Sequence, residues 1–274
     1  SVIIGAAMMF SSTIIGLKLL PTTVLHHQHT GEIIISILLL QDVLAILILL
    51  ILPAQWENTF PIYEVGKMLV SLIGIILFAY LFERFVLIKL IRRFDKIHEY
   101  IFLMAIGWCL SMAELAHMIG LSAEIGAFIA GIVLATNPIS LFIAESLKPL
   151  RDFFLVIFFF ALGASFDLTI IEQVLVPGLV LAGIMMLIKP YSFKFLLGRY
   201  GESPQRAMEV GVRLGQISEF SLFIAVLALE LNVIGTQASY LIQVSTLITF
   251  IVSSYFIVLR YPTPIAVSDK LRRN

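Results

Sequence analysis

Cysteine and charge are both scarce in this sequence, and each scarcity excludes a class of protein. Cys109 is the only cysteine in 274 residues, and one cysteine forms neither an internal disulfide nor a cluster of thiolate metal ligands. Charged residues make up 13% of the chain, whereas a soluble domain has about 25%. The 18 basic and 18 acidic residues cancel, so no net positive field predicts a nucleic-acid partner.

Apolar residues are abundant instead, at 60% of the chain, and the mean hydropathy is +1.04. Long apolar runs between polar breaks are typical of membrane-spanning helices, which need about 20 residues each. The runs are continuous rather than alternating, so they predict helices and not the strands of a barrel. We expect nine spans, at 1–20, 31–52, 64–85, 99–118, 121–137, 149–167, 172–195, 207–230 and 238–259.

The basic residues support this division. With Lys189 and Arg213 set aside as intramembrane, alternate loops place 15 basic residues on one side and only Lys67 on the other. Cytoplasmic loops carry such an excess. We therefore expect a multi-pass protein, in a bacterial inner membrane, with one transmembrane domain at 1–260 and a short cytoplasmic tail at 261–274. The chain starts inside an apolar run and has no basic leader, so it does not start with a signal peptide, and we expect further helices upstream.

Asp42 lies near the middle of the second run, where few polar side chains share its charge. A charge at the bilayer centre costs about 2.5–3.5 kcal/mol on insertion scales, so an acid at this depth is a candidate for function. Such a carboxylate can hold a proton or a small cation, but not readily both. The alternative is an aspartate that only pairs with a basic residue of another helix.

Lys189 precedes Pro190 in the seventh run. A proline frees a backbone carbonyl one turn earlier and kinks the helix. We expect the lysine to neutralise either Asp42 or the exposed carbonyls of a broken helix. The alternative is that its side chain reaches the cytoplasmic interface.

Two runs contain clusters of polar residues that fit poorly in lipid. Such stretches must face protein or water, and the backbone there can be unwound. The spacing of Gln216 and Glu219 also predicts that they share a helical face. The alternative is ordinary polar packing between membrane helices. The candidate residues are Ser11, Ser12 and Thr13 in the first run and Arg213, Gln216, Ser218 and Glu219 in the eighth.

Three histidines, His26, His27 and His29, follow the first run. Histidines so grouped can bind a metal or respond to pH. A fourth ligand is not nearby, so we expect a solvated loop and no metal site.

The order of these features resembles the monovalent cation:proton antiporter-2 family, which includes the Kef-type potassium efflux systems. The resemblance covers almost the whole chain. It rests on Ser11-Ser12-Thr13, Gln41-Asp42, the segments 120–131 and 158–163, Lys189, and the segment 215–220.

This resemblance implies an all-α polytopic membrane bundle with the sodium/proton-antiporter-like inverted-repeat fold. The first and eighth runs would be two broken helices that cross at mid-membrane. Asp42 would match the family's ion-carrying aspartate, and Lys189 the lysine of the symmetry-related helix. A dimerisation domain would complete a homodimer in the whole protein, although its N-terminal helices are not in this chain.

The implied function is secondary active exchange of K⁺ or Na⁺ for a proton by alternating access around Asp42. Hydroxyl and amide oxygens suit a hard cation, and Gln216 and Glu219 would line the opposing break. Family members with two adjacent acids tend to be electrogenic, so Gln41 before Asp42 predicts electroneutral exchange. No cofactor is expected. The predicted cation ligands besides Asp42 are Ser11, Ser12, Thr13 and Gln41.

Three alternatives stay open. A gated potassium efflux channel would use the same cavity without obligatory proton coupling. An intramembrane enzyme is disfavoured, because the sequence has no serine-protease motif and Asp42 with Glu219 is a poor pair for aspartyl proteolysis. Finally, this chain, without upstream helices, would transport nothing by itself.

Overall fold

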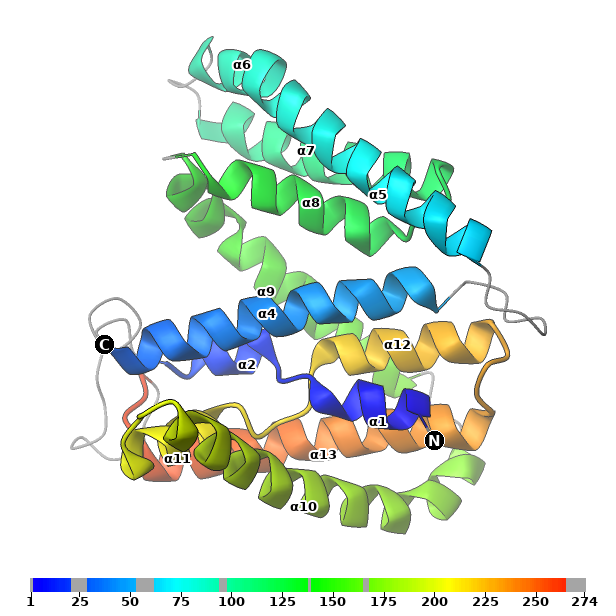
Figure 1. The fold of residues 1–274 in the computed structure, drawn as a ribbon, viewed down its shortest axis with the longest axis vertical. Coiled ribbons are helices and arrows are strands. Elements are labelled where there is room, and N and C mark those ends of the chain that lie inside the picture. The colour runs from blue at the N-terminus through cyan, green and yellow to red at the C-terminus, as the bar shows by residue number, and fades with distance from the viewer. Residues whose placement is uncertain are drawn as a thin grey trace. The chain divides into compact units, whose positions relative to one another are not determined.

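The computed structural model describes residues 2–20, 29–52, 62–93, 98–137, 139–164 and 168–264. Every regular element assigned in these ranges is a helix (Figure 1). The chain divides into two compact units. The first unit is Ser1–Ile48 with Phe166–Asn274, and the second is Leu49–Ser165.

Within its described residues, the first unit contains seven helices, and α1 at the N-terminus packs against α12 and α13. Helix α13 contacts four other helices of this unit, namely α10, α12, α11 and α1. The helices are α1 (Val2–Met9), α2 (Thr13–Lys18), α4 (His29–Ile51, which leaves the unit after Ile48), α10 (Leu168–Arg199), α11 (Pro204–Arg213), α12 (Glu219–Glu230) and α13 (Thr236–Arg260).

The second unit is a helical bundle of its own. Helices α7 and α8 form a close pair, and Trp108 of α7 donates from Nε1 to the carbonyl oxygen of Ala130 in α8 at 3.2 Å. The tight turn between them uses Gly120 at φ 84°, a backbone conformation that favours glycine. The elements are α5 (Ile62–Phe82), the π-helix η1 (Glu83–Leu87), α6 (Ile88–Arg93), α7 (His98–Met118), α8 (Ala123–Ala135) and α9 (Ser140–Ala164).

Five stretches in the described part are long and apolar enough to cross a membrane. The helical membrane protein predicted from the sequence is therefore confirmed, whereas the predicted number of nine spans is not established by helix length. The first and eighth runs are each interrupted, so each is divided into two short helices. None of these short helices is as long as a membrane span, which is why a criterion of helix length does not count them. The five are His29–Ile51, Gly66–Ile91, Glu99–Met118, Thr169–Arg199 and Thr236–Arg260.

After each interruption, the next helix begins with a serine N-cap. Helix α2 begins after Ser12, whose Oγ accepts from the N–H of Ile15 at 3.1 Å. Helix α12 begins after Ser218, whose Oγ accepts from the N–H of Phe220 at 3.1 Å. A serine at this position satisfies one of the free N–H groups of the new helix, which lets the chain restart a helix inside a buried bundle.

The interrupted backbone corrects one prediction. Gln216 and Glu219 do not share a helical face, because Gln216 lies in the non-helical stretch between α11 and α12. Figure 1 shows that α1 and α12 lie towards one end of the first unit, and α2 and α11 towards the other. The two interruptions therefore fall in the middle of this unit.

Close packing holds α10 against α11 at Pro190. A Cβ atom on Gly211 would lie 2.6 Å from the carbonyl oxygen of Pro190 and 2.8 Å from its Cα. Only glycine fits such an approach without a shift of backbone. Because Lys189 directly precedes this proline, the contact between Gly211 and Pro190 also fixes the position of the Lys189 backbone.

Candidate functional site

The two interruptions lie against one another. Ser11 Oγ donates to the carbonyl oxygen of Leu214 at 2.7 Å, across 203 residues of sequence. Gln216 Nε2 donates to the carbonyl oxygen of Ser12 at 3.4 Å. The structure thus brings together the two polar clusters that the sequence singled out separately, and both lie in the first unit.

Lys189 joins the two interruptions. Its side chain is buried, and Nζ donates to the carbonyl oxygens of Phe10 and of Gln216, each at 2.7 Å. Both carbonyls lie in non-helical backbone, where no helical N–H is available to them. We expected Lys189 to neutralise either Asp42 or the exposed carbonyls of a broken helix, and the structure shows the contact with the carbonyls. Lys189 forms no ion pair with Asp42 among the described residues, and its buried side chain does not extend to the membrane interface.

Asp42 is buried and faces the first interruption. Thr13 Oγ1 lies 3.2 Å from Oδ1 and 3.4 Å from Oδ2 of this carboxylate. The neighbouring Gln41 reaches the same stretch, because its Oε1 accepts from the backbone N–H of Ser11 at 2.8 Å. Two neighbouring residues of α4, Gln41 and Asp42, therefore contact the interruption between α1 and α2.

Glu219 brings a second carboxylate to the place where the two interruptions meet. It begins α12 and is 8% exposed. Its Oε1 accepts from the N–H of Ile14 at 3.3 Å, whereas Oε2 is buried with no hydrogen-bond partner in the part of the chain that the structure describes. Burying such an atom without a partner is costly, which makes this oxygen a candidate position for a proton or a cation.

Two hydroxyl residues of α13 also support the interruption, and the sequence analysis missed them. Ser253 Oγ donates to Oε1 of Gln216 at 3.1 Å, and Thr249 Oγ1 accepts from the N–H of Ile217 at 3.0 Å. A signal was present, since Ser245, Thr249 and Ser253 recur every four residues and so lie on one face of a helix.

Arg213 was predicted to belong to the same polar site, but its side chain is used elsewhere. It is 1% exposed, and Nε donates to Glu209 at 2.9 Å. Its other nitrogens donate to the carbonyl oxygens of Leu19 at 3.3 Å and Pro262 at 3.0 Å. The guanidinium carbon also lies 5.3 Å from the ring centre of Tyr261. Arg213 therefore ties the ends of α2, α11 and α13 together.

These contacts also bear on the expected C-terminal tail. Residues 261 to 264 pack onto the first unit, and Thr263 is fully buried. The remaining residues of the predicted tail, 265–274, lie outside the described residues.

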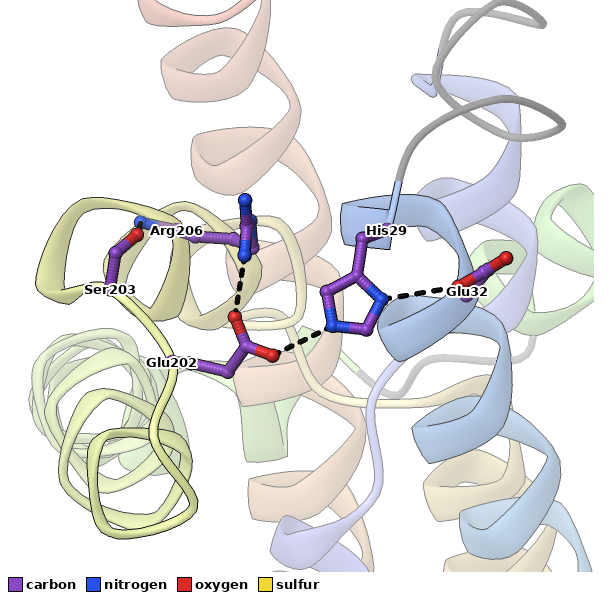
Figure 2. A network of polar contacts seen from close by, with 5 residues as sticks. All are labelled: His29, Glu32, Glu202, Ser203 and Arg206. Atoms are coloured by element: carbon purple, nitrogen blue, oxygen red, sulfur yellow. Dashed lines mark hydrogen bonds and ion pairs between the residues drawn. The ribbon is translucent and has the colours of Figure 1, made fainter.

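A second polar network lies at the α2 and α11 end of the first unit (Figure 2). His29 is the first residue of α4 rather than part of a loop, with Nδ1 3.1 Å from Glu32 and Nε2 2.8 Å from Glu202. Arg206 donates to the other oxygen of Glu202 at 2.8 Å. The hydrogen bonds from Arg206 and then His29 lower the pKa of Glu202.

Within the described ranges, no group of three or more histidine, cysteine, aspartate or glutamate side chains could hold a metal ion. His26 and His27 lie outside the described residues.

Comparison with known proteins identifies the family of this chain. The transmembrane model of the sodium/hydrogen exchanger family matches residues 1–259. K(+) efflux antiporter 6 of Arabidopsis thaliana is 25% identical over 260 residues, which cover 91% of this chain and 43% of that protein. The iron transporter MagA of Paramagnetospirillum magneticum is 24% identical over 94% of this chain and 59% of its own length.

The putative cation/proton antiporter YbaL of Escherichia coli is 27% identical over 92% of this chain and 47% of its own length. The chain thus spans about half the length of the curated relatives that it matches. All three are named as cation transporters, although the cations named differ. Because the family model matches nearly the whole sequence, this chain, an integral membrane protein, belongs to the sodium/hydrogen exchanger family.

Proposed function

We propose that this chain carries the exchange site of a monovalent cation:proton antiporter. One observation carries the proposal: a buried carboxylate, Asp42, contacts Thr13 at an interruption whose carbonyls are held by the buried ammonium of Lys189. The family membership and the names of the relatives support the same activity.

In this proposal Asp42 alternates between two ligands. Facing one side of the membrane it takes a proton, and facing the other it exchanges that proton for K⁺ or Na⁺. An aspartate with neighbouring hydroxyl and carbonyl oxygens is suited to a hard cation. Among the predicted hydroxyl ligands, Thr13 fits best, because it already contacts Asp42, while Ser12 caps α2 and Ser11 donates to Leu214.

Lys189 has a supporting role in the same scheme. Its positive charge balances the partial negative charge of two interrupted backbone segments, whose carbonyls it holds together. It does not contact Asp42 directly, so the carboxylate stays available for a proton or a cation.

Stoichiometry follows from the residue before the aspartate. Gln41 cannot carry a second charge, and we propose that one proton is exchanged for one cation. The transport rate in vesicles should then not change when the membrane potential is clamped at different values. A dependence of the rate on the potential would reject electroneutral exchange but leave the site in place.

The assay of the exchange itself uses proteoliposomes with an imposed pH gradient. Addition of K⁺ or Na⁺ should dissipate the gradient with the native chain, and Asp42→Asn should abolish this response. Asp152→Asn is the matched control, because this aspartate lies outside the site in the second unit. Undiminished exchange by Asp42→Asn would reject the mechanism, and cation flux indifferent to the pH gradient would favour the channel instead.

The remaining parts of the proposal concern the whole protein. We propose alternating access by an inverted-repeat fold, a homodimer, and a bacterial inner membrane with the C-terminus in the cytoplasm. If the chain alone gives no exchange while a version extended upstream does, then the chain carries the site but needs further helices to operate it.

A further inference from the structure

A cavity of about 630 Å³ opens at one end of the first unit, away from the crossing of the interruptions. Its wall is formed by the last turns of α10, the start of α11 and the end of α13. The polar residues that matter here are Lys194, Ser203, Arg206, Glu209, Arg260 and Tyr261. Helix ends of this kind lie where an apolar bundle meets the headgroups of a bilayer.

Three basic side chains from three different helices converge on this cavity. Lys194 comes from α10, Arg206 from α11 and Arg260 from α13. Glu209 is the acidic residue of the wall, and its carboxylate already accepts from Arg213 at 2.9 Å. Lys194 and Arg260 form no ion pair within the part of the chain that the structure describes. The cavity therefore has an excess of uncompensated positive charge.

Arg206 is held in place by the network of Figure 2. Its guanidinium donates to Glu202 at 2.8 Å, and His29 contacts the other oxygen of the same carboxylate at 2.8 Å. Glu202 therefore offsets the charge of Arg206, and the uncompensated positive charge of the wall comes from Lys194 and Arg260. This arrangement fixes the arginine at the cavity edge.

The backbone adds to this field. Helix α11 begins directly after Ser203, and its first turn forms part of the cavity wall. Pro204 has no N–H and the N–H of Arg206 donates to Ser203 Oγ at 3.4 Å, so Gln205 is the residue of this turn whose N–H is not used by the serine cap. The N-terminus of a helix attracts anions, and phosphate groups above all. Two unpaired cations, a fixed arginine and a helix start therefore act on the same space.

We propose that this cavity binds a phosphate group, supplied either by the headgroup of an anionic phospholipid or by free phosphate. Basic pockets between membrane helices on the cytoplasmic side bind lipid headgroups in this way. The site is separate from the exchange site around Asp42, and the proposal does not depend on the proposed function.

The test uses the full chain in detergent and phosphatidylglycerol as the probe, with phosphatidylcholine as the neutral lipid. Lys194→Gln combined with Arg260→Gln removes both unpaired charges. Lys89→Gln combined with Lys148→Gln is the matched control, since both lysines are exposed and belong to the second unit. Retained lipid is counted by native mass spectrometry at fixed ionic strength.

We expect the cavity variant to retain roughly thirtyfold less phosphatidylglycerol than the native chain or the control, because each of the two basic residues removed contributes about 1 kcal/mol near an anionic headgroup. Phosphatidylcholine should bind all three proteins alike. Equal retention of phosphatidylglycerol by all three would overturn a lipid headgroup as the source.

Inorganic phosphate forms the second arm and identifies the other source. If free phosphate is the ligand, it raises the unfolding temperature of the native chain and control at matched ionic strength, but not that of the cavity variant. If neither lipid retention nor phosphate stabilisation depends on the two residues, the proposal is wrong. Should the double variant fail to fold, Lys194→Gln alone serves, because this side chain is exposed.

Discussion

The ammonium group of Lys189 donates to the carbonyl oxygen of Phe10 at 2.7 Å, across 179 residues of sequence. The same nitrogen reaches the carbonyl oxygen of Gln216 at 2.7 Å. One side chain therefore satisfies the backbone of two interrupted helices at once. This explains how two breaks are tolerated inside a buried bundle, where an unpaired carbonyl would otherwise destabilise the fold.

Lys189→Met should destabilise the protein strongly. The change leaves two buried carbonyls without a donor, and each unsatisfied group costs about 1–3 kcal/mol. We expect a clearly lower unfolding temperature in detergent. Lys148→Met, at an exposed lysine of the second unit, is the control and should leave the temperature unchanged. Equal stability of the two variants would show that the carbonyls do not need the lysine.

Thr13→Val should weaken cation binding more than it weakens folding. It removes the hydroxyl that contacts both oxygens of Asp42 and keeps the shape of the side chain. A loss of about 1 kcal/mol corresponds to roughly a fivefold rise in the cation concentration needed for half-maximal exchange. Thr13→Ser should restore the native value. If the valine and serine variants behave alike, the hydroxyl is not a ligand.

Gly211→Ala should perturb the packing that positions Lys189. The new Cβ atom would meet the carbonyl oxygen of Pro190 at 2.6 Å, and overpacking of this kind costs about 1–3 kcal/mol. Gly183→Ala is the control, because no atom lies within 4 Å of its Cβ position. We expect the first variant to unfold at a lower temperature than the native chain and the second to unfold at the same temperature or above. Unchanged stability of Gly211→Ala would mean that α10 and α11 can separate freely.

Glu202 predicts a pH-dependent contribution to stability. Arg206 and then His29 lower its pKa below the ordinary value of 4.5. A depressed carboxyl pKa stabilises the folded state above that ordinary value, and the contribution disappears as the pH falls through the folded pKa. Glu202→Gln should therefore lower the unfolding temperature at neutral pH but make little difference in strong acid. A difference that stays constant over this pH range would contradict an electrostatic origin.

Much of the candidate site could be predicted from the sequence. Asp42, Lys189 and the two serine-containing clusters were identified because polar groups inside apolar runs are costly, and that cost depends only on position along the run. The break in the eighth run was anticipated for the same reason. The prediction that Gln216 and Glu219 share a face was wrong, because it assumed a continuous helix that the capping serine interrupts.

Other features could not be found in this way. Arg213 has the same unfavourable position as Lys189, yet its partners are Glu209, Leu19 and Pro262. Ser253 and Thr249 are ordinary residues of a membrane helix until the structure places them against Gln216 and Ile217. Each assignment depends on which distant segment lies opposite, and no local pattern contains that information.

The sequence by itself determined that this is a helical membrane protein with a few polar groups where lipid would reject them, because the free energy of placing a residue in a bilayer depends on local composition. Only the tertiary structure decided where the helices stop and restart and which carbonyls Lys189 holds. It also decided that Thr13 is the hydroxyl at Asp42. These choices rest on contacts between residues far apart in the chain, whose geometry is set only when the helices pack.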